Sequence, residues 1–285
     1  MRAAEFAGKL RKALWLALEH DVLNTAKASA YSGMLMLFPT MVVVTSLLAL
    51  VPEGTTLLGE IRYTLMHFLP DDTMSLLADS MQSRRIGSTQ VLFSALLLSL
   101  LAALGMMLSL MEGFRRAYRL PREQWGFLER RVRAFLLVPM VHIPLALASV
   151  LLVFGHTIEQ WMIENAVHEL RFALIFFWRM IRWSIALATS ITVLGALYHF
   201  GTKRTEHWIH VMPGAITATV VWFPATLAFG WYVTRIANYA RFYGPFAAGI
   251  ATLVWLYLTC FSALLGAELN GVLFRARSQS ASNGE

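Results

Sequence analysis

The feature that most constrains this chain is the absence of charge over six long windows. None of its 24 Lys and Arg or 17 Asp and Glu residues falls within 28–52, 86–111, 134–158, 183–202, 207–234 or 242–267. A helix needs about 20 mostly apolar residues to cross about 30 Å of hydrocarbon, and every window reaches that length. A soluble helical domain would instead place charges on the outer face of each helix. We therefore predict an all-α, polytopic membrane bundle of six transmembrane helices.

Lys and Arg residues divide unevenly between the segments that join these windows. Residues 1–27, 112–133, 203–206 and 268–285 hold sixteen of them, and the alternate segments hold eight. Segments rich in Lys and Arg stay on the cytoplasmic side of a membrane. The division predicts that both termini are cytoplasmic.

Three further segments have patterns of their own. Apolar residues recur every four positions from Phe6 to Leu18 beside basic residues, which predicts a cytoplasmic amphipathic helix over 1–27 on the membrane surface. The outer segment 53–85 has two helical stripes broken at Pro70, which predicts a short extracytoplasmic helical hairpin. We assign 28–272 to the membrane domain and 273–285 to a disordered cytoplasmic tail.

Prolines lie within the spans or at their ends, and arginines lie beside tryptophans before the fourth span. Five prolines fall in the spans or at their ends and are expected to kink or break the helices there, namely Pro39, Pro139, Pro144, Pro213 and Pro224. Arg179 and Arg182 stand beside tryptophans before the fourth span. Both the interface belt and the bundle interior remain open for these two arginines.

Several short motifs carry a resemblance to a known family. They are Leu197-Tyr198, Met212-Pro213-Gly214-Ala215 leading to Trp222, Tyr243-Gly244, Leu253-Val254-Trp255-Leu256-Tyr257-Leu258 and Leu265-Gly266-Ala267-Glu268-Leu269-Asn270. Tyr31, Phe38-Pro39 and the stretch from Arg115 to Tyr118 agree more loosely. Together they resemble the YihY/BrkB family of bacterial inner-membrane proteins, once mislabelled ribonuclease BN. The resemblance implies a multi-pass protein of the bacterial inner (plasma) membrane, suspected of transport. It also implies structural roles for Tyr31, Pro39, Tyr198, Pro213, Gly214, Gly244, Trp255 and Gly266.

The segment 112–133 carries arginine and no lysine. Its seven arginines are Arg115, Arg116, Arg119, Arg122, Arg130, Arg131 and Arg133. The planar guanidinium binds phosphate oxygens in pairs, so Arg115, Arg116, Arg119 and Arg122 are our candidates for binding an anionic headgroup. The alternative is a charge run that only fixes the topology of the loop.

Three polar residues stand at the ends of apolar runs. Glu268 and Asn270 follow the last window, and Glu112 follows the second at a position where the family often has Asn. A carboxylate at the end of a membrane helix reaches water or needs a partner. We predict that Glu268 pairs with Arg115 or Arg116, either as a gate or coupling site or only to lock the helix ends.

The remaining patterns exclude several classes of function. The sequence contains no hydrolase or phosphate-loop motif and no Cys or His spacing typical of a metal site. Its longest segment outside the windows is 53–85, which is too short for an aqueous domain that would bind RNA. We therefore expect no enzymatic activity, no cofactor, no metal and no nucleic acid, and we expect membrane lipids, anionic ones included, as partners. The sequence favours a transporter or flippase of an anionic or amphipathic envelope substrate. The alternative is a non-transporting membrane scaffold or envelope-integrity factor.

Overall fold

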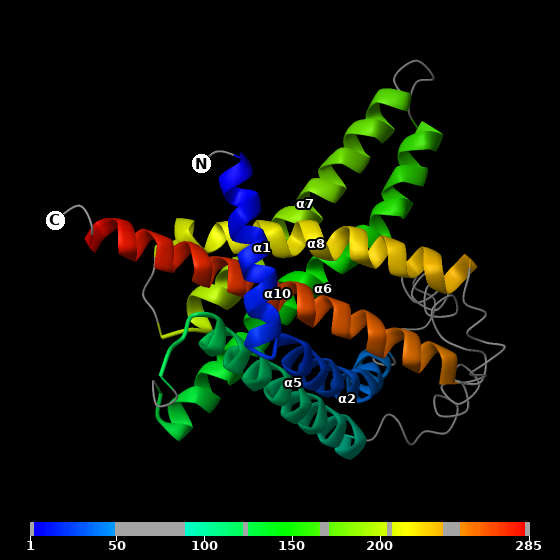
Figure 1. The fold of residues 1–285 in the computed structure, drawn as a ribbon. Helices are drawn as coiled ribbons and strands as arrows, with labels where there is room; N and C mark the ends of the chain where they lie inside the picture. The colour runs from blue at the N-terminus through cyan, green and yellow to red at the C-terminus, as the bar shows by residue number, and fades with distance from the viewer. Residues whose placement is uncertain are drawn as a thin grey trace. The chain divides into compact units, whose positions relative to one another are not determined.

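The computed structural model describes residues 3–48, 89–121, 125–165, 171–203, 207–235 and 246–282, and in these ranges it is built of helices without strands (Figure 1). The all-α prediction is confirmed. The helices are α1 (Ala3–Glu19), α2 (Val22–Leu48), α5 (Thr89–Ala117), α6 (Phe127–Asn165), α7 (Arg171–Phe200), α8 (Trp208–Arg235) and α10 (Ala247–Ser282).

All of these helices except α1 are long and apolar enough to cross a membrane, which confirms the six predicted spans. Each contains one of the charge-free windows or most of it. The predicted hairpin over 53–85 lies outside the described residues. Many large apolar side chains of the spans are exposed, as expected where helices face lipid rather than water.

The helices form two compact units. The first contains Met1–Leu23, Leu110–Phe223 and Phe261–Glu285, and the second contains Asn24–Ser109 and Pro224–Cys260. In the second unit, small residues allow the helices to pack closely. Gly33 of α2 lies against Met106 of α5 and Leu256 of α10, and a Cβ at Gly33 would stand 3.3 Å from the Met106 sulfur. The hydroxyls of Thr40 and Ser99 also form a hydrogen bond of 2.6 Å between α2 and α5.

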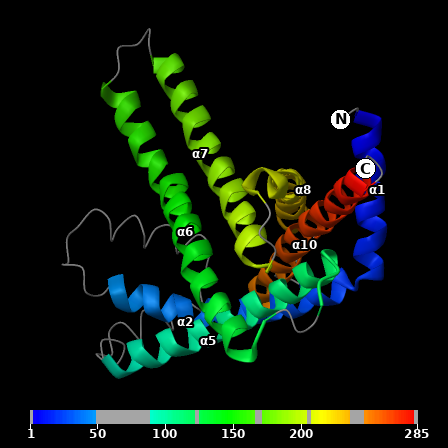
Figure 2. The ribbon, with the colours of Figure 1, turned by 90° about the vertical axis from the view of Figure 1, so that its left-hand side faces the viewer.

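In the first unit, α1 lies across the last part of α10, and α6 and α7 run side by side (Figure 2). One face of α1 is buried against α10. Ala13 and Leu16 of α1 form a cluster with Leu269, Val272 and Leu273 of α10. The opposite face of α1 exposes Arg11 and Lys12, so this helix is amphipathic, as the sequence predicts, and it also leaves Trp15 73% exposed.

Two expectations about helix continuity need correction. The helices α2 and α6 continue through their internal prolines Pro39, Pro139 and Pro144, and α8 continues through Pro213 and Pro224. The expected breaks at these prolines are therefore wrong, and the expected kinks stay a prediction. The helix α10 is also continuous to Ser282, where a disordered tail was expected from residue 273 onward. Side-chain contacts extend past residue 273 as well, since Arg275 Nη1 donates to the carbonyl of Ala117 at 3.2 Å.

Candidate functional site

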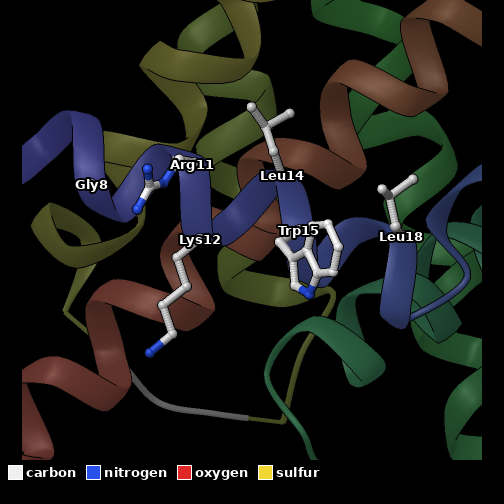
Figure 3. A pocket seen from close by; sticks show the side chains of 6 residues that line it. All are labelled: Gly8, Arg11, Lys12, Leu14, Trp15 and Leu18. Carbon is white, nitrogen blue, oxygen red and sulfur yellow. The ribbon is translucent and has the colours of Figure 1, made fainter.

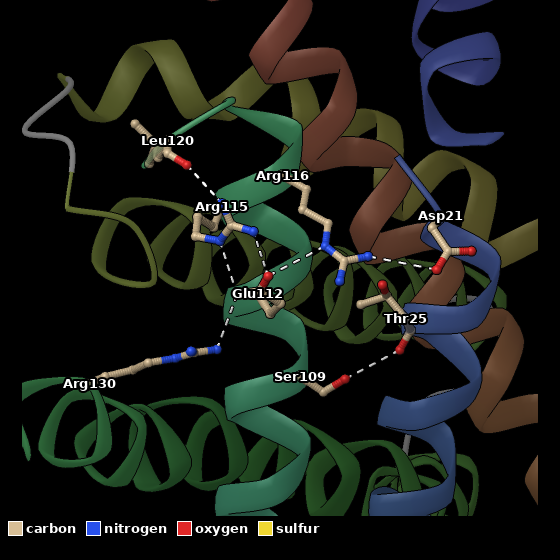
Figure 4. A network of polar contacts seen from close by, with 8 residues as sticks. All are labelled: Asp21, Thr25, Ser109, Glu112, Arg115, Arg116, Leu120 and Arg130. Carbon is tan, nitrogen blue, oxygen red and sulfur yellow. Dashed lines mark hydrogen bonds and ion pairs between the residues drawn. The ribbon is translucent and has the colours of Figure 1, made fainter. Parts of the chain in front are cut away.

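Three arginines of the segment 112–133 surround the carboxylate of Glu112, which lies near the end of α5 (Figure 4). Arg115 binds it with two atoms, Nη2 at 2.6 Å and Nε at 3.0 Å. Arg116 Nε and Arg130 Nη2 each approach it to 3.4 Å. Arg115 and Arg116 are three and four residues after Glu112, and this spacing places them on the same face of the helix. One carboxylate therefore gathers three guanidinium groups.

The end of α5 explains why Arg115 differs from the others. Arg119 has a φ of 54°, and the N–H groups of Arg119 and Leu120 donate to the carbonyls of Arg116 and Arg115, each at 2.9 Å. These bonds form the helix C-cap known as a Schellman motif. Arg115 Nη1 also donates to the carbonyl of Leu120 at 2.9 Å. All three nitrogens of Arg115 are thus used within the turn, and its side chain is only 13% exposed.

Other arginines of this segment are more accessible. The side chains of Arg116 and Arg130 are 37% and 38% exposed, and Arg119 is exposed. Arg131 lies over the ring of Phe127 with 3.5 Å to its centroid. Arg122 lies outside the described residues. Of the four candidate headgroup-binding residues, Arg116 and Arg119 can meet a ligand, whereas Arg115 is committed to the turn.

Glu268 of α10 has a different partner from the predicted one. Its Oε1 accepts a hydrogen bond from Nδ1 of His20, at 2.8 Å. His20 lies in the turn between α1 and α2, and Glu268 is fully buried. The predicted pairing with Arg115 or Arg116 is wrong, because Glu112 lies on the same helix as those arginines and binds both of them.

The second oxygen of Glu268 is buried and has no hydrogen-bond partner among the described residues. Arg275 and Arg119 act on this carboxylate electrostatically, and Nη2 of Arg275 is likewise buried without a described partner. A buried carboxylate with one unsatisfied oxygen is costly to hold. Glu268 therefore holds His20 through one oxygen, while its other oxygen lacks a hydrogen-bond partner among the described residues.

Asn270 joins α10 to the start of α8. Its Oδ1 accepts from the N–H of Gly214 at 2.8 Å, and its Nδ2 donates to the carbonyl of Val211 at 2.9 Å. The two helices are close because both present a glycine. A Cβ at Gly266 would stand 2.5 Å from the carbonyl oxygen of Gly214 and 2.5 Å from the hydroxyl of Tyr198.

Tyr198 completes this crossing. Its hydroxyl donates to the carbonyl of Ala263 at 2.6 Å, and its ring meets that of Phe114 edge to face. Of the motif residues predicted to be structural, Tyr198, Gly214 and Gly266 meet here, with Pro213 beside Gly214. Tyr31, Pro39 and Trp255 lie in the second unit, and Gly244 lies outside the described residues.

The three residues predicted as a gating or helix-end group thus belong to three separate contacts. Glu112 gathers arginines, Glu268 binds His20, and Asn270 bridges α8 and α10. Sequence reasoning missed His20. The available signal was its position, because it lies just before the second helix, near the end of the bundle where Glu268 was expected.

A shallow pocket lies on the surface of α1 (Figure 3). All the residues that line it come from α1, and they are Gly8, Arg11, Lys12, Leu14, Trp15 and Leu18. Basic and exposed apolar side chains lie side by side there, as on helices that rest at the boundary between headgroups and acyl chains.

Comparisons with known proteins agree with this architecture. The family model described as Virulence factor BrkB matches residues 16–285. The chain is 27% identical over 260 residues to the ribonuclease-like protein YfkH of Bacillus subtilis (strain 168), covering 90% of this chain and 92% of that protein.

Two further relatives are UPF0761 membrane proteins. Those of Chromohalobacter salexigens and Aromatoleum aromaticum are 26% and 28% identical to this chain, each over 88% of its length. The chain spans only 59% and 60% of these two relatives. No solved structure matches the chain.

Proposed function

We propose that this chain, which belongs to the virulence factor BrkB family of integral membrane proteins, is a transporter or flippase for an anionic, amphipathic component of the bacterial envelope. We further propose that it lies in the inner membrane with both termini in the cytoplasm. The observation that carries the proposal is the group of accessible arginines around Glu112, at the end of a span and beside exposed apolar side chains.

The charge balance of this group favours an anionic ligand. The described arginines of the whole segment 112–133 are Arg115, Arg116, Arg119, Arg130, Arg131 and Arg133, and the carboxylates that pair with them are Glu112, Glu129 and Asp21. Positive charge therefore exceeds negative charge two to one. Guanidinium groups bind phosphate oxygens through two parallel hydrogen bonds, and each basic residue near an anionic leaflet contributes about 1 kcal/mol.

The apolar neighbours favour a ligand that is also lipid-like. Phe127 and Leu128 begin α6 next to these arginines, and they are 76% and 71% exposed. A headgroup bound by Arg116 and Arg130 would thus have its acyl chains beside apolar surface. The shallow pocket on α1, with Arg11, Lys12 and Trp15, likewise has basic side chains beside apolar ones.

The contact between His20 and Glu268 supports the proposal that the turn between α1 and α2 moves during transport. Ionisable groups buried at membrane depth are rare and are functional candidates by default. Glu268 holds the turn between α1 and α2 against α10, and one of its oxygens is unsatisfied among the described residues. Release of this contact would free the turn next to the arginines, and we assign it the role of a gate.

Leaflet transfer in reconstituted vesicles tests the proposal. Vesicles would contain fluorescent phosphatidylglycerol or fluorescent phosphatidylcholine, and dithionite would quench the label in the outer leaflet. We expect the protein to transfer the anionic lipid in preference to the zwitterionic one. The Arg116→Gln/Arg130→Gln variant should transfer it at least about tenfold more slowly, since it loses two charge-assisted contacts.

The matched control removes the same charge elsewhere. Lys9→Gln/Lys27→Gln changes two lysines whose contacts with Glu5 and Asn24 are exposed, and it should transfer at the parental rate. Equal rates for the arginine variant, the lysine variant and the parent would contradict the assignment of the arginines.

A non-transporting scaffold or envelope-integrity factor is the second candidate, and one observation favours it. Several hydroxyls inside the described spans donate to carbonyls of their own helix and thus offer no polar path, among them those of Ser29, Thr217 and Thr219. A scaffold of this kind would bind anionic vesicles through the same arginines without any leaflet transfer.

We also propose that the protein is not an enzyme, although one relative is named ribonuclease-like. The chemistry of its polar residues supports this. Its buried carboxylates and amide serve helix contacts, and no three His, Cys, Asp or Glu side chains in the described ranges are grouped to hold a metal. This view would be contradicted if the purified protein degraded RNA and if the Glu268→Gln change abolished that degradation.

A further inference from the structure

The turn between α1 and α2 is held by two contacts between ionisable groups. Asp21 in this turn has a φ of 60°, and its carboxylate approaches Nη1 of Arg116 on α5 to 3.8 Å (Figure 4). The neighbouring His20 lies with its Nδ1 2.8 Å from Oε1 of Glu268 on α10. Two adjacent residues therefore connect the turn to an accessible arginine on one helix and to a buried carboxylate on another.

The hydrogen bond between His20 and Glu268 can hold one more proton without needing a cavity. An ionised carboxylate only accepts hydrogen bonds, so with Glu268 charged the donor is the N–H at Nδ1 of His20. The His20 side chain is 14% exposed and that of Glu268 is fully buried, so a proton from water reaches the pair through the imidazole. When this proton bonds to Nε2, the proton at Nδ1 can pass to Oε1. Glu268 is then neutral, and its O–H donates to Nδ1 of a neutral imidazole.

The surroundings of Glu268 support both of its forms. The ionised form is compensated by Arg119, just after α5, and by Arg275 on α10 itself, which both act on this carboxylate electrostatically. It is opposed by burial, because Oε2 has no hydrogen-bond partner among the described residues. A buried carboxylate in this situation lowers its cost by taking up a proton. The group therefore lies between two opposing influences.

The other elements that pack against this part of α10 add little charge. Their described residues there are Ala13 and Leu16 of α1, Tyr198 of α7, and Gly214 and Ala218 of α8. Of these only Tyr198 is titratable, and its hydroxyl donates to the carbonyl of Ala263. The protonation of Glu268 is thus governed by His20, Arg119 and Arg275.

Loss of the charge on Glu268 weakens the contacts at the end of α5. Gly271 of α10 lies directly on the carbonyl of Ala117, to which Arg275 Nη1 donates at 3.2 Å. With Glu268 neutral, Arg119 and Arg275 repel each other without a compensating negative charge. The bond to His20 also loses its charge assistance, which supplies about half of its strength. A proton therefore loosens both the turn and the end of the helix that carries Arg116.

A headgroup bound by Arg116 acts on the same turn. Its phosphate competes with Asp21 for the guanidinium, and this ion pair is weak because Asp21 and Arg116 are 55% and 37% exposed. Displacement of Asp21 removes the second contact that holds the turn. A proton on Glu268 and an anion on Arg116 therefore favour the same released turn. Two ligands that favour one conformation strengthen each other's binding.

We propose that His20 and Glu268 form a proton-binding site coupled to Arg116, so that a proton on Glu268 tightens the binding of an anionic phospholipid and the lipid promotes uptake of the proton. The coupling rests on the proposed function only in that Arg116 holds the headgroup, and it does not require leaflet transfer. Uptake of a proton together with an anionic headgroup offsets one negative charge.

Infrared difference spectroscopy of the purified full chain in detergent micelles tests the proton site by itself. Between about pH 8 and about pH 6, where exposed carboxylates stay ionised, the parent should gain the C=O band of a protonated carboxyl group. Glu268→Gln should lack this band, whereas Glu19→Gln, which removes an exposed carboxylate of α1, should retain it. A parental spectrum without the band, or the same band in Glu268→Gln, would overturn the proposal whether or not the protein transports lipid.

Binding of short-chain phosphatidylglycerol to the same micelles tests the coupling. We expect the Kd of the parent and of Glu19→Gln to be about tenfold lower at about pH 6 than at about pH 8. Glu268→Gln is neutral at both pH values and should bind with the tighter affinity throughout. Asp21→Asn changes an exposed side chain, so it carries the test if the Glu268 variant does not fold. It should bind more tightly at the higher pH and lose most of the pH dependence.

Three results of this binding assay count against the account in different ways. No binding at either pH would overturn both the coupling and the assignment of the arginines. Equal parental affinities at the two pH values, or parental pH dependence in Glu268→Gln and Asp21→Asn, would overturn the coupling alone. Coupled binding by a protein that transfers no lipid between leaflets would support the proton site and contradict only the transport proposal.

Discussion

Replacing Asn270 with alanine removes both side-chain hydrogen bonds that join α10 to the start of α8. The N–H of Gly214 and the carbonyl of Val211, now paired at 2.8 Å and 2.9 Å, would be left without their partner. Both groups belong to buried residues. A buried polar group that loses its partner costs about 1–3 kcal/mol in water-soluble proteins, and side-chain hydrogen bonds between membrane helices average about 0.6 and reach about 1.7 kcal/mol.

Two such losses at once place the expected destabilisation of Asn270→Ala at about 1–3 kcal/mol. The assay is the free energy of unfolding of the purified protein in mixed micelles, followed by circular dichroism during titration with a denaturing detergent. The matched control is Asn24→Ala, which truncates an exposed asparagine and should change the free energy by less than about 0.5 kcal/mol. Equal stability of Asn270→Ala and the control would refute the view that this amide holds the two helices together.

Three further predictions concern residues of α10. Glu268→Ala should lower the free energy of unfolding by about 1–2 kcal/mol, because it removes the hydrogen bond to His20, and an unchanged value in the same assay would remove the argument for a buried pair. Gly266→Ala should destabilise the protein by about 1–3 kcal/mol or more, since its Cβ meets backbone at 2.5 Å, whereas Gly230→Ala, with open space around it, should be tolerated. A reporter fused after Arg277 should read cytoplasmic, and an extracytoplasmic reading would reverse the proposed orientation.

Much of the fold follows from one property of the sequence. The cost of placing charge in hydrocarbon is so large that six charge-free windows define six spans without any knowledge of packing. Proline was less informative, because a membrane helix can accommodate the missing N–H, and α2 remains helical through a buried Pro39.

The partners of individual side chains were much harder to predict. Arg115 and Glu112 are three residues apart, so helical spacing alone could have identified their contact. His20 and Glu268 are separated by 248 positions, and nothing local links them. Their contact depends on α1 lying across α10, which is decided by the packing of Ala13 and Leu16 against Leu269.

The motif residues show a similar limit. Gly214, Gly266 and Asn270 could be singled out from the sequence, and each was assigned a role by itself. Their convergence requires α8 and α10 to approach until a Cβ would collide with backbone. Small residues permit such an approach, but they do not specify which helices make it.

We propose above that an anionic, amphipathic molecule binds the accessible arginines around Glu112. The most direct measurement is mass spectrometry of the lipids that copurify with the protein from its native membrane, compared with the bulk lipid of that membrane. We expect enrichment of an anionic lipid or lipid-linked phosphate in the parent protein, and loss of that enrichment in Arg116→Gln/Arg130→Gln. A bound-lipid composition equal to that of the bulk membrane, in parent and variant alike, would contradict it.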